Sequence, residues 1–152
     1  MRVVALTDSG RGLDDCCPAQ PTQIPAIRRA VSDVAQRCGA CDSTLTRIEL
    51  AVTEAATNVV LHAYRTPRDE GLIHYSARLH KDCLDVSVRD DGVGMSPNPA
   101  SPGLGLGLSL MAHEADSCEI RGTAGGGTEV LMHFGMGTCG PRSPRPAVSA
   151  LA

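Results

Sequence analysis

The sequence predicts an α+β fold, a two-layer sandwich in which helices cover one face of a mixed, mostly antiparallel sheet. Two stretches with helical spacing come first, two pairs of short alternating stretches follow, and a shorter helical stretch separates the pairs. This order is typical of helices packed on one face of a sheet. A chain of 152 residues suffices for one such domain.

The helices expected first are predicted over residues 24–38 and over a longer stretch that ends near Tyr64. In the first, apolar residues recur at every third or fourth position, which indicates one buried face. Asp42, Ser43 or Thr44 can cap the second. Because the second helix is apolar on more than one face, we expect it to be central.

The second half of the chain predicts two strand pairs with a helix between them. Residues 72–79 and 83–89 form a hairpin, and the latter alternates clearly between apolar and polar side chains. Residues 108–115 suit a short helix. Residues 117–121 and 128–134 predict two further strands around a glycine turn.

The chain divides into a leader, one folded domain and a tail. Residues 1–19 are poorly patterned and hold at most a short edge strand, whereas residues 20–135 carry the periodic segments. Residues 136–152 are rich in Gly, Pro and Ser and predict a disordered tail. Within the domain, residues 90–107 are too interrupted by Gly and Pro for either regular element.

Composition argues against nucleic acid as a partner. Aromatic residues make up only 2% of the chain, and base-stacking modules need aromatic platforms. The formal net charge of −3 provides no basic field for a phosphate backbone.

A membrane location is not expected either, and the cysteines favour the cytoplasm. No apolar run reaches the length of a membrane span, and the run Val3–Leu6 is too short for a signal peptide. An odd count of seven cysteines predicts reduced thiols. Cys16-Cys17 and the Cys38–Cys41 CxxC pair could hold zinc, or the latter could be a redox pair, but small core residues are favoured.

Glu54 and Asn58 are the first candidate site residues. They lie four positions apart on the second predicted helix and therefore share a face. A carboxylate can act as a general base, and an amide oxygen suits Mg²⁺. The alternative is a solvent-facing polar stripe, and the pair alone does not decide between the two.

Asp90, Gly92 and Gly94 follow the alternating strand directly. A carboxylate at a strand end can accept a hydrogen bond from an exocyclic amine such as adenine N6, and glycines let the backbone approach a flat ligand. An ordinary Asp-Gly turn explains these residues equally well.

Gly103, Gly105, Gly107 and Leu108 lead into the third predicted helix. Glycines before a helix N-terminus can form a phosphate cradle from free N–H groups and the helix dipole. The spacing matches neither a P-loop nor a Rossmann turn. Phosphate binding is favoured over a flexible loop pinned to the core.

These segments, with the later Gly127-Thr128, resemble the ordered ATP-binding boxes of the GHKL (Bergerat-fold) ATPases. Within that superfamily the chain most resembles the bacterial anti-sigma-factor serine/threonine kinases, above all in the stretch IELAVTEAATNVVLHAY at residues 48–64. The resemblance covers roughly residues 20–134 and implies a histidine-kinase-like ATPase fold. His62 and Tyr64 match the family pattern, but no chemistry is assigned to them.

The resemblance implies ATP and Mg²⁺ as cofactors and a role for each box. Glu54 would accept the proton of a substrate hydroxyl, Asn58 would bind Mg²⁺, and Asp90 would hold the adenine amine. The remaining expected nucleotide contacts are Gly92, Gly94, Gly103, Gly105, Gly107, Leu108 and Thr128. Residues 95–102 contain no Lys or Arg, which leaves phosphate neutralisation to Mg²⁺ and the backbone.

The same resemblance implies the partners. The substrate would be an anti-anti-sigma protein, the helical surface would bind a sigma factor, and a homodimer is expected. Two alternatives remain: a nucleotide-binding module that sequesters its partner without phosphate transfer, and an ATP hydrolase switch. Retention of both Glu54 and Asn58 argues against the first.

Overall fold

The computed structural model of the chain describes residues 12–64, 71–93, 104–137 and 149–150. The strands are β1 (Gly12–Pro18), β2 (Leu72–His80), β3 (Cys83–Asp90), β4 (Ser117–Gly122), β5 (Thr128–Gly135) and β6 (Ser149–Ala150). The helices are α1 (Ile24–Arg37), α2 (Asp42–Asn58) and α3 (Leu104–Glu114), with a short 3₁₀-helix η2 (Pro21–Gln23) and a π-helix η3 (Val59–Ala63).

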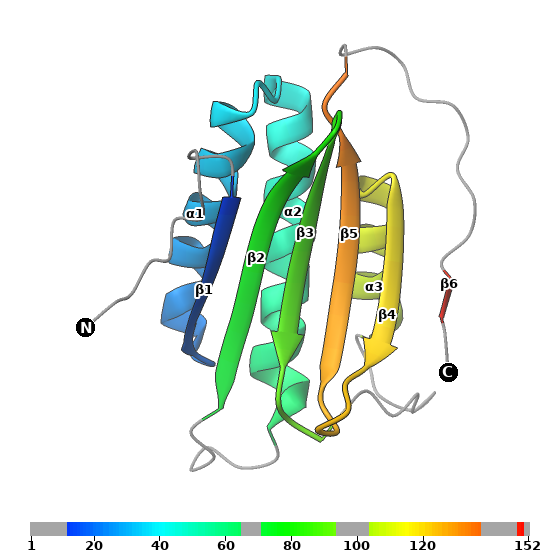
Figure 1. Cartoon of the computed structure of the whole chain (residues 1–152). Coiled ribbons are helices and arrows are strands. Elements are labelled where there is room, and N and C mark those ends of the chain that lie inside the picture. Colours follow the sequence, from blue (N-terminus) through cyan, green and yellow to red (C-terminus); the bar gives the residue numbers. More distant parts are fainter. Residues whose placement is uncertain (1–11, 65–70, 94–103, 138–148, 151–152) are drawn as a thin grey trace.

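The strands form one six-stranded sheet in the order β1-β2-β3-β5-β4-β6. All neighbouring strands are antiparallel except β4 and β6, which are parallel. In Figure 1 the three described α-helices all lie behind the sheet, on one face. The predicted α+β fold, with a mixed, mostly antiparallel sheet and one helical layer, is confirmed.

Three local predictions need correction. The third helix begins at Leu104 rather than at residue 108, so it includes glycines that were expected to precede it. The second helix does not stay α-helical to Tyr64, because it changes to η3 after Asn58. A strand also occurs where a disordered tail was expected, since β6 lies within residues 136–152, most of which fall outside the described residues. β1 is the short edge strand that the sequence allowed within residues 1–19.

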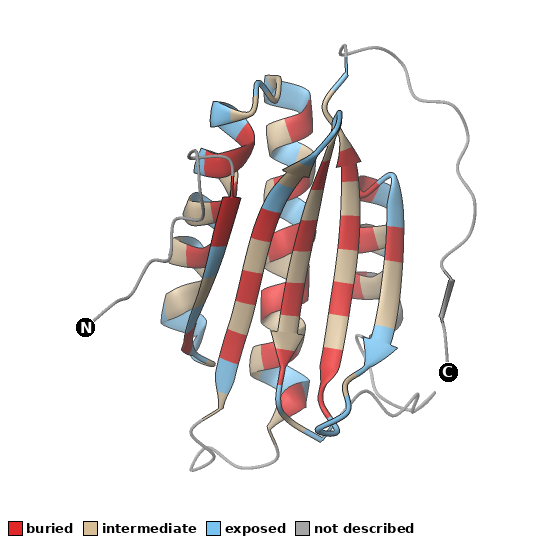
Figure 2. Cartoon of the chain, in the orientation of Figure 1, coloured by how far each residue is buried: buried red, intermediate tan, exposed pale blue. Residues whose placement is uncertain are grey.

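The core lies between the sheet and the helices. Apolar side chains of β3 and β5 alternate with polar ones and point toward the helical layer, which produces the banded strands of Figure 2. Helix α2 is central, with Ile48, Ala51, Val52, Ala55 and Ala56 at most 1% exposed. Small alanine side chains let α2 lie close to the sheet, so the polar positions of its last turns are held beside α3.

The cysteines only partly follow expectation. Cys17 and Cys118 are buried thiols, and burial, with a smaller effect of Glu119, raises the pKa of Cys118 to about 11. Cys38 is a free thiol that packs against the core, so it forms no disulfide with Cys41. Cys41 itself is disulfide-bonded, which corrects the prediction that all seven thiols are reduced. Within the described residues, no helix combines the length and apolar character needed to cross a membrane.

Candidate functional site

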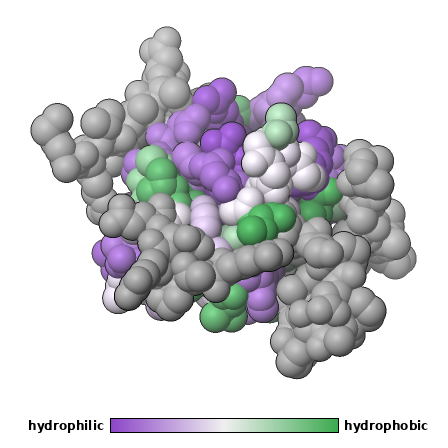
Figure 3. Space-filling model, turned by 90° about the horizontal axis from the view of Figure 1, so that it is seen from below, coloured by the Kyte–Doolittle hydropathy of each residue, from purple (hydrophilic) through white to green (hydrophobic). Residues whose placement is uncertain are grey.

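The predicted site residues gather at one end of the sheet, the lower end in Figure 1. Here β3 ends at Asp90, β5 begins at Thr128, α2 ends at Asn58 and α3 begins at Leu104. Because β3 and β5 are antiparallel neighbours, the end of one lies beside the start of the other. Figure 3 views the molecule from this end, where hydrophilic side chains gather in a band beside scattered hydrophobic ones.

Asp90 is the buried carboxylate of this site, with only 4% of its surface exposed. Its Oδ1 accepts hydrogen bonds from the backbone N–H groups of Gly92 at 2.8 Å and Thr128 at 3.3 Å. Both bonds go to the same oxygen, so Oδ2 can accept a further hydrogen bond. Burial raises the pKa of Asp90 above its usual value, and Asp91 raises it slightly further, whereas the two N–H groups lower it.

Gly92 and Gly127 are required by backbone packing around Asp90. A Cβ on Gly92 would overlap the carbonyl oxygen of Ala63, and one on Gly127 would overlap the carbonyl oxygen of Asp90. The Val93 N–H also donates to the Ala63 carbonyl at 3.0 Å. The end of β3 is thereby joined directly to η3, which was not foreseen from the sequence, where Gly92 was interpreted as space for a ligand.

Glu54 and Asn58 lie side by side and face α3. A Cβ built on Gly107 would lie 3.1 Å from Glu54 Oε2 and 3.4 Å from both amide atoms of Asn58. Three residues from two separate predicted segments are therefore in direct proximity. Only a glycine at position 107 leaves this space open beside the carboxylate and the amide.

Asn58 carries an unpartnered polar atom at the same place. Its Nδ2 is the one buried side-chain nitrogen or oxygen atom of the described residues that has no hydrogen-bond partner. Such a group costs about 1–3 kcal/mol unless a ligand satisfies it. A half-turn about the last side-chain bond exchanges Nδ2 with Oδ1, so this position can offer either a donor or an oxygen ligand.

The other predicted nucleotide contacts have mixed outcomes. Gly105 lies in the first turn of α3, where backbone N–H groups have no partner within the helix and are available to an anion. Leu108 lies beyond that turn, and its side chain packs against the core, so its nucleotide contact stays a prediction. Gly94 and Gly103 lie outside the described residues.

Tyr64 is a residue of this site that the sequence interpretation left without a role. Its hydroxyl donates to the Leu72 carbonyl at 2.7 Å and accepts from the N–H groups of Leu72 at 3.0 Å and Asp91 at 3.3 Å. It therefore ties the end of η3 to the start of β2 and to the residue after Asp90. The His-x-Tyr pattern at residues 62–64 was the available signal; His62 itself is exposed.

Comparison with known proteins then decides the family, because residues 17–134 match the histidine kinase-like ATPase domain. The chain belongs to this family. It is 32% identical to an anti-sigma F factor of Pasteuria penetrans over 58% of this chain and 66% of that protein. It is 30% identical to the serine-protein kinase RsbW of Bacillus subtilis over 71% of this chain and 76% of that one. The match to the anti-sigma F factor thus spans just under two thirds of that relative.

Solved structures agree on the fold of this histidine kinase-like ATPase. One is the crystal structure of the RsbU and RsbW domains of Rv1364c from Mycobacterium tuberculosis, with a TM-score of 0.65, 22% identity, and coverage of 90% of this chain and 34% of that one. The other is the histidine kinase domain of a blue-light activated kinase from Erythrobacter litoralis, with a TM-score of 0.51, 24% identity, and coverage of 78% and 61%.

Proposed function

We propose that this histidine kinase-like ATPase is an ATP- and Mg²⁺-dependent protein serine/threonine kinase that also acts as an anti-sigma factor. The observation that carries the proposal is the convergence of Glu54 and Asn58 on the side-chain-free surface of Gly107. A general base, an oxygen ligand and a helix N-terminus are thereby brought together, which are parts that phosphoryl transfer needs. The relatives named anti-sigma F factor and serine-protein kinase support the same function.

The residues fit the nucleotide at both of its ends. Asp90 Oδ2 would accept a hydrogen bond from the adenine amine, while the N–H groups of Gly92 and Thr128 hold the carboxylate in place through Oδ1. At the other end, the first-turn N–H groups of α3 would bind the phosphates, and the Asn58 amide, whose Nδ2 is buried and unpartnered, would hold Mg²⁺ through its oxygen. When bound, ATP and Mg²⁺ supply the transferable phosphoryl group and neutralise its charge.

Glu54 is assigned the proton transfer. Its carboxylate lies beside Gly107 and close to Asn58, so it faces the phosphate end of the proposed site rather than the adenine end. It would accept the proton of a serine or threonine hydroxyl as that oxygen attacks phosphorus. A positioned base of this kind contributes about 10²–10⁴-fold to the rate.

The partners follow from the same proposal. The substrate is an anti-anti-sigma protein whose hydroxyl reaches Glu54, and the sigma factor binds the helical layer, which leaves the nucleotide site accessible. We further propose that the chain works as a homodimer in the cytoplasm. Light scattering on the purified chain, alone and with a sigma factor, measures both associations.

The decisive experiment is transfer of γ-labelled phosphate from ATP to a candidate anti-anti-sigma protein by the wild type and by Glu54→Gln. We expect Glu54→Gln to bind ATP within about threefold of wild type but to lose about 10²–10⁴-fold in transfer rate. The matched control is Glu119→Gln, because Glu119 pairs with Arg121 on the opposite face of the sheet.

Each departure from that result has a meaning. Undiminished transfer by Glu54→Gln would exclude Glu54 as the base. ATP binding by the wild type without transfer to any candidate would favour the sequestration module, and steady phosphate release without a protein substrate would favour the hydrolase. Failure to bind ATP would exclude the proposal entirely.

A further inference from the structure

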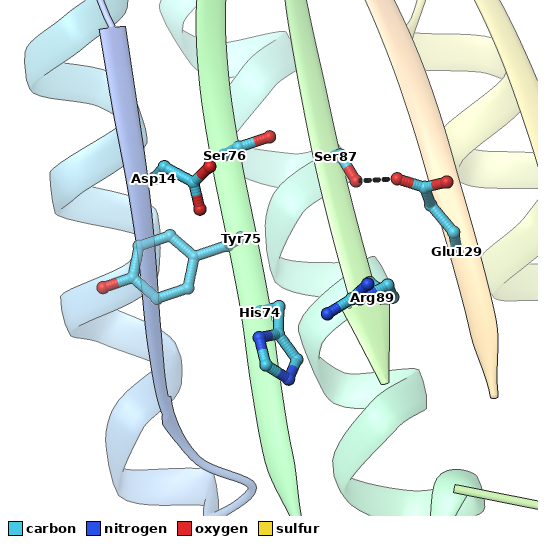
Figure 4. Close-up of a pocket in the computed structure, with 7 residues that line it drawn as sticks. All are labelled: Asp14, His74, Tyr75, Ser76, Ser87, Arg89 and Glu129. Carbon is cyan, nitrogen blue, oxygen red and sulfur yellow. Dashed lines mark hydrogen bonds between the residues drawn. The ribbon is translucent and has the colours of Figure 1, made fainter. Parts of the chain in front are cut away.

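The face of the sheet opposite the helices carries the polar side chains that alternate with buried ones along β3 and β5. A cavity of about 210 Å³ lies on this face. Figure 4 shows the side chains that line it, among them Asp14, Ser76, Ser87 and Glu129. Several of its polar groups already have partners: Ser87 Oγ donates to Glu129 Oε1 at 2.7 Å, His74 Nε2 lies 2.6 Å from Asp91 Oδ2, and Asp14 pairs with Arg78. The cavity therefore offers few unused ligands, and a different cluster lies further along the same face.

That cluster consists of Cys83, Asp85 and His133. Asp85 on β3 lies directly opposite His133 on β5 in the antiparallel register. Cys83 precedes Asp85 by two positions, so it points to the same face. The side chains meet as the register requires: His133 Nδ1 is 2.6 Å from Asp85 Oδ1, and the three potential ligand atoms all lie within 4.8 Å of one another.

We propose that Cys83, Asp85 and His133 form a zinc-binding site. Thiolate, carboxylate and imidazole are the three kinds of side-chain ligand that Zn²⁺ takes in proteins, and three such ligands leave a fourth position for water. Donor atoms bound tetrahedrally at 2.0–2.3 Å lie about 3.3–3.6 Å apart. The distances between the three potential ligand atoms, from 2.6 Å to at most 4.8 Å, bracket that value. Small rotations of the side chains would therefore bring the three atoms to zinc-binding distances.

The chemistry of the surroundings suits a soft divalent cation. The thiolate disfavours Mg²⁺ and Ca²⁺, which prefer oxygen ligands. The Asp85 carboxylate, together with the thiolate that Cys83 must become in order to bind a metal, makes the local field negative. A cation between these groups compensates that field.

Zinc binding replaces a proton and a hydrogen bond of the cluster by bonds to the metal. Cys83 gives its thiol proton to solvent, and His133 presents Nδ1 with its remaining proton on Nε2. The hydrogen bond between Asp85 and His133 is replaced by two coordinate bonds, and the metal then links β3 to β5. Side-chain exposures of 34% for Asp85 and 28% for His133 leave a path from solvent.

The zinc site is separate from the nucleotide site. It lies near the upper end of β3 in Figure 1, whereas Asp90 ends that strand. Asp85 and Asp90 are five residues apart, roughly 17 Å along a strand, and they point to opposite faces of the sheet. Metal binding can therefore be measured without ATP, and its outcome does not depend on the proposed kinase activity.

The test is a titration of the full chain with Co²⁺, and then Zn²⁺ in competition, in the presence of a non-thiol reductant. We expect one equivalent of Co²⁺ with a thiolate charge-transfer band and tetrahedral ligand-field bands, both removed by Zn²⁺. Cys83→Ser and His133→Gln should each weaken binding by at least about 100-fold, since even outer-shell partners contribute 10–100-fold. Cys16→Ser, which removes an exposed free thiol of β1, should bind like the wild type.

Thermal denaturation is a second measurement, which distinguishes loss of the metal site from misfolding of a variant. Zn²⁺ should raise the Tm of the wild type and of Cys16→Ser but not that of Cys83→Ser or His133→Gln, with circular dichroism checking that each variant is folded. No thiolate band in the wild type would overturn the proposal. Wild-type affinity in folded Cys83→Ser or folded His133→Gln would overturn it as well.

Discussion

Asp90 is held in the fold at a cost to stability. Because its pKa is raised in the folded state, mainly by burial, the folded protein disfavours the charged carboxylate relative to the unfolded chain. The contribution of this residue to stability therefore falls as pH rises from the unfolded value of 3.8 through the raised folded value. Above that window the penalty is complete, which is consistent with a residue retained for binding rather than for stability.

The substitution Asp90→Asn separates the effect of this residue on stability from its proposed effect on ATP binding. The amide keeps an oxygen that can accept from Gly92 and Thr128 but presents NH₂ in place of Oδ2. At pH 7 we expect a higher Tm than wild type for the ATP-free protein, with the difference shrinking toward pH 3.8 and below. ATP affinity should fall about 10- to 100-fold, the value of a hydrogen bond to a charged group. Thermal denaturation across pH and calorimetric ATP titration measure both; equal ATP affinity would contradict the assigned contact.

Tyr64 positions the end of β3, where Asp90 lies, and the two tyrosines of the chain allow a matched test. Tyr64→Phe removes the hydroxyl contacts with Leu72 and Asp91, and Tyr75→Phe removes a 2.9 Å bond to Asp15 near the other edge of the sheet. Both should lose about 1 kcal/mol in urea unfolding. Only Tyr64→Phe should also weaken ATP binding. Its affinity for ATP should fall by about 3- to 10-fold, which corresponds to a free-energy loss of about 1 kcal/mol. Equal ATP affinity in the two variants would mean that Tyr64 is structural only.

At the scale of elements, the π-helix η3 connects the end of α2 to the residues that follow β3. It follows Asn58 directly, and its last carbonyl, that of Ala63, accepts from Val93 after the end of β3. Single π-helical turns within α-helices are frequently found at functional sites. Here the change of helix type brings the end of the helix that carries Glu54 and Asn58 against the segment that carries Asp90.

Helix α3 contributes an unusual feature, a glycine within its interior that faces α2. Gly107→Ala should raise helix propensity by about 0.8–1 kcal/mol, and its nearest neighbour would be the mobile end of Glu54 at 3.1 Å. We expect a Tm equal to or above wild type but at least about tenfold weaker ATP binding, since one tenfold step needs only 1.4 kcal/mol of lost contact.

The matched control is Gly122→Ala, where a Cβ would meet nothing within 4 Å. Its ATP affinity should equal that of the wild type. Retained ATP affinity in Gly107→Ala would show that the space beside Glu54 and Asn58 is not where the nucleotide binds.

The whole molecule is a sheet with one apolar face and one polar face. A single helical layer covers the apolar face, and its core is built almost entirely from aliphatic side chains. Phe134 is the only phenylalanine of the chain, is fully buried, and has the Arg47 guanidinium 5.8 Å from its ring centre. The stability of the domain therefore depends strongly on this one large side chain.

Phe134→Ala should destabilise the protein by about 3–5 kcal/mol, because no neighbouring aromatic residue can fill the cavity. Since domains are stable by only about 5–15 kcal/mol, the urea midpoint should fall by a large fraction. Leu61→Ala is the control, with 64% of its surface exposed, and should change stability by less than about 0.5 kcal/mol. A small effect of Phe134→Ala would mean that the core repacks.

Much of the fold could be predicted from local patterns. The alternation in residues 83–89 predicted β3, and helical spacing predicted α1 and most of α2, because side-chain periodicity depends on only a few neighbouring residues. The start of α3 was missed because glycine lowers helix propensity, and packing against α2 overrides that preference. β1 was expected only as a possible short strand, since its pairing with β2 joins residues far apart in sequence.

By itself, the sequence determined the order of the elements and the shared face of Glu54 and Asn58. Its ordered motifs also indicated the ATPase family to which the chain belongs. The tertiary structure decided which of these motifs meet: Gly107 beside Glu54, Thr128 bonded to Asp90, and Tyr64 joining η3 to two strands. It also decided that Cys83, Asp85 and His133 share one face. The physical reason is that spacing along the chain governs local conformation, whereas contacts between distant residues arise only from strand register and helix packing.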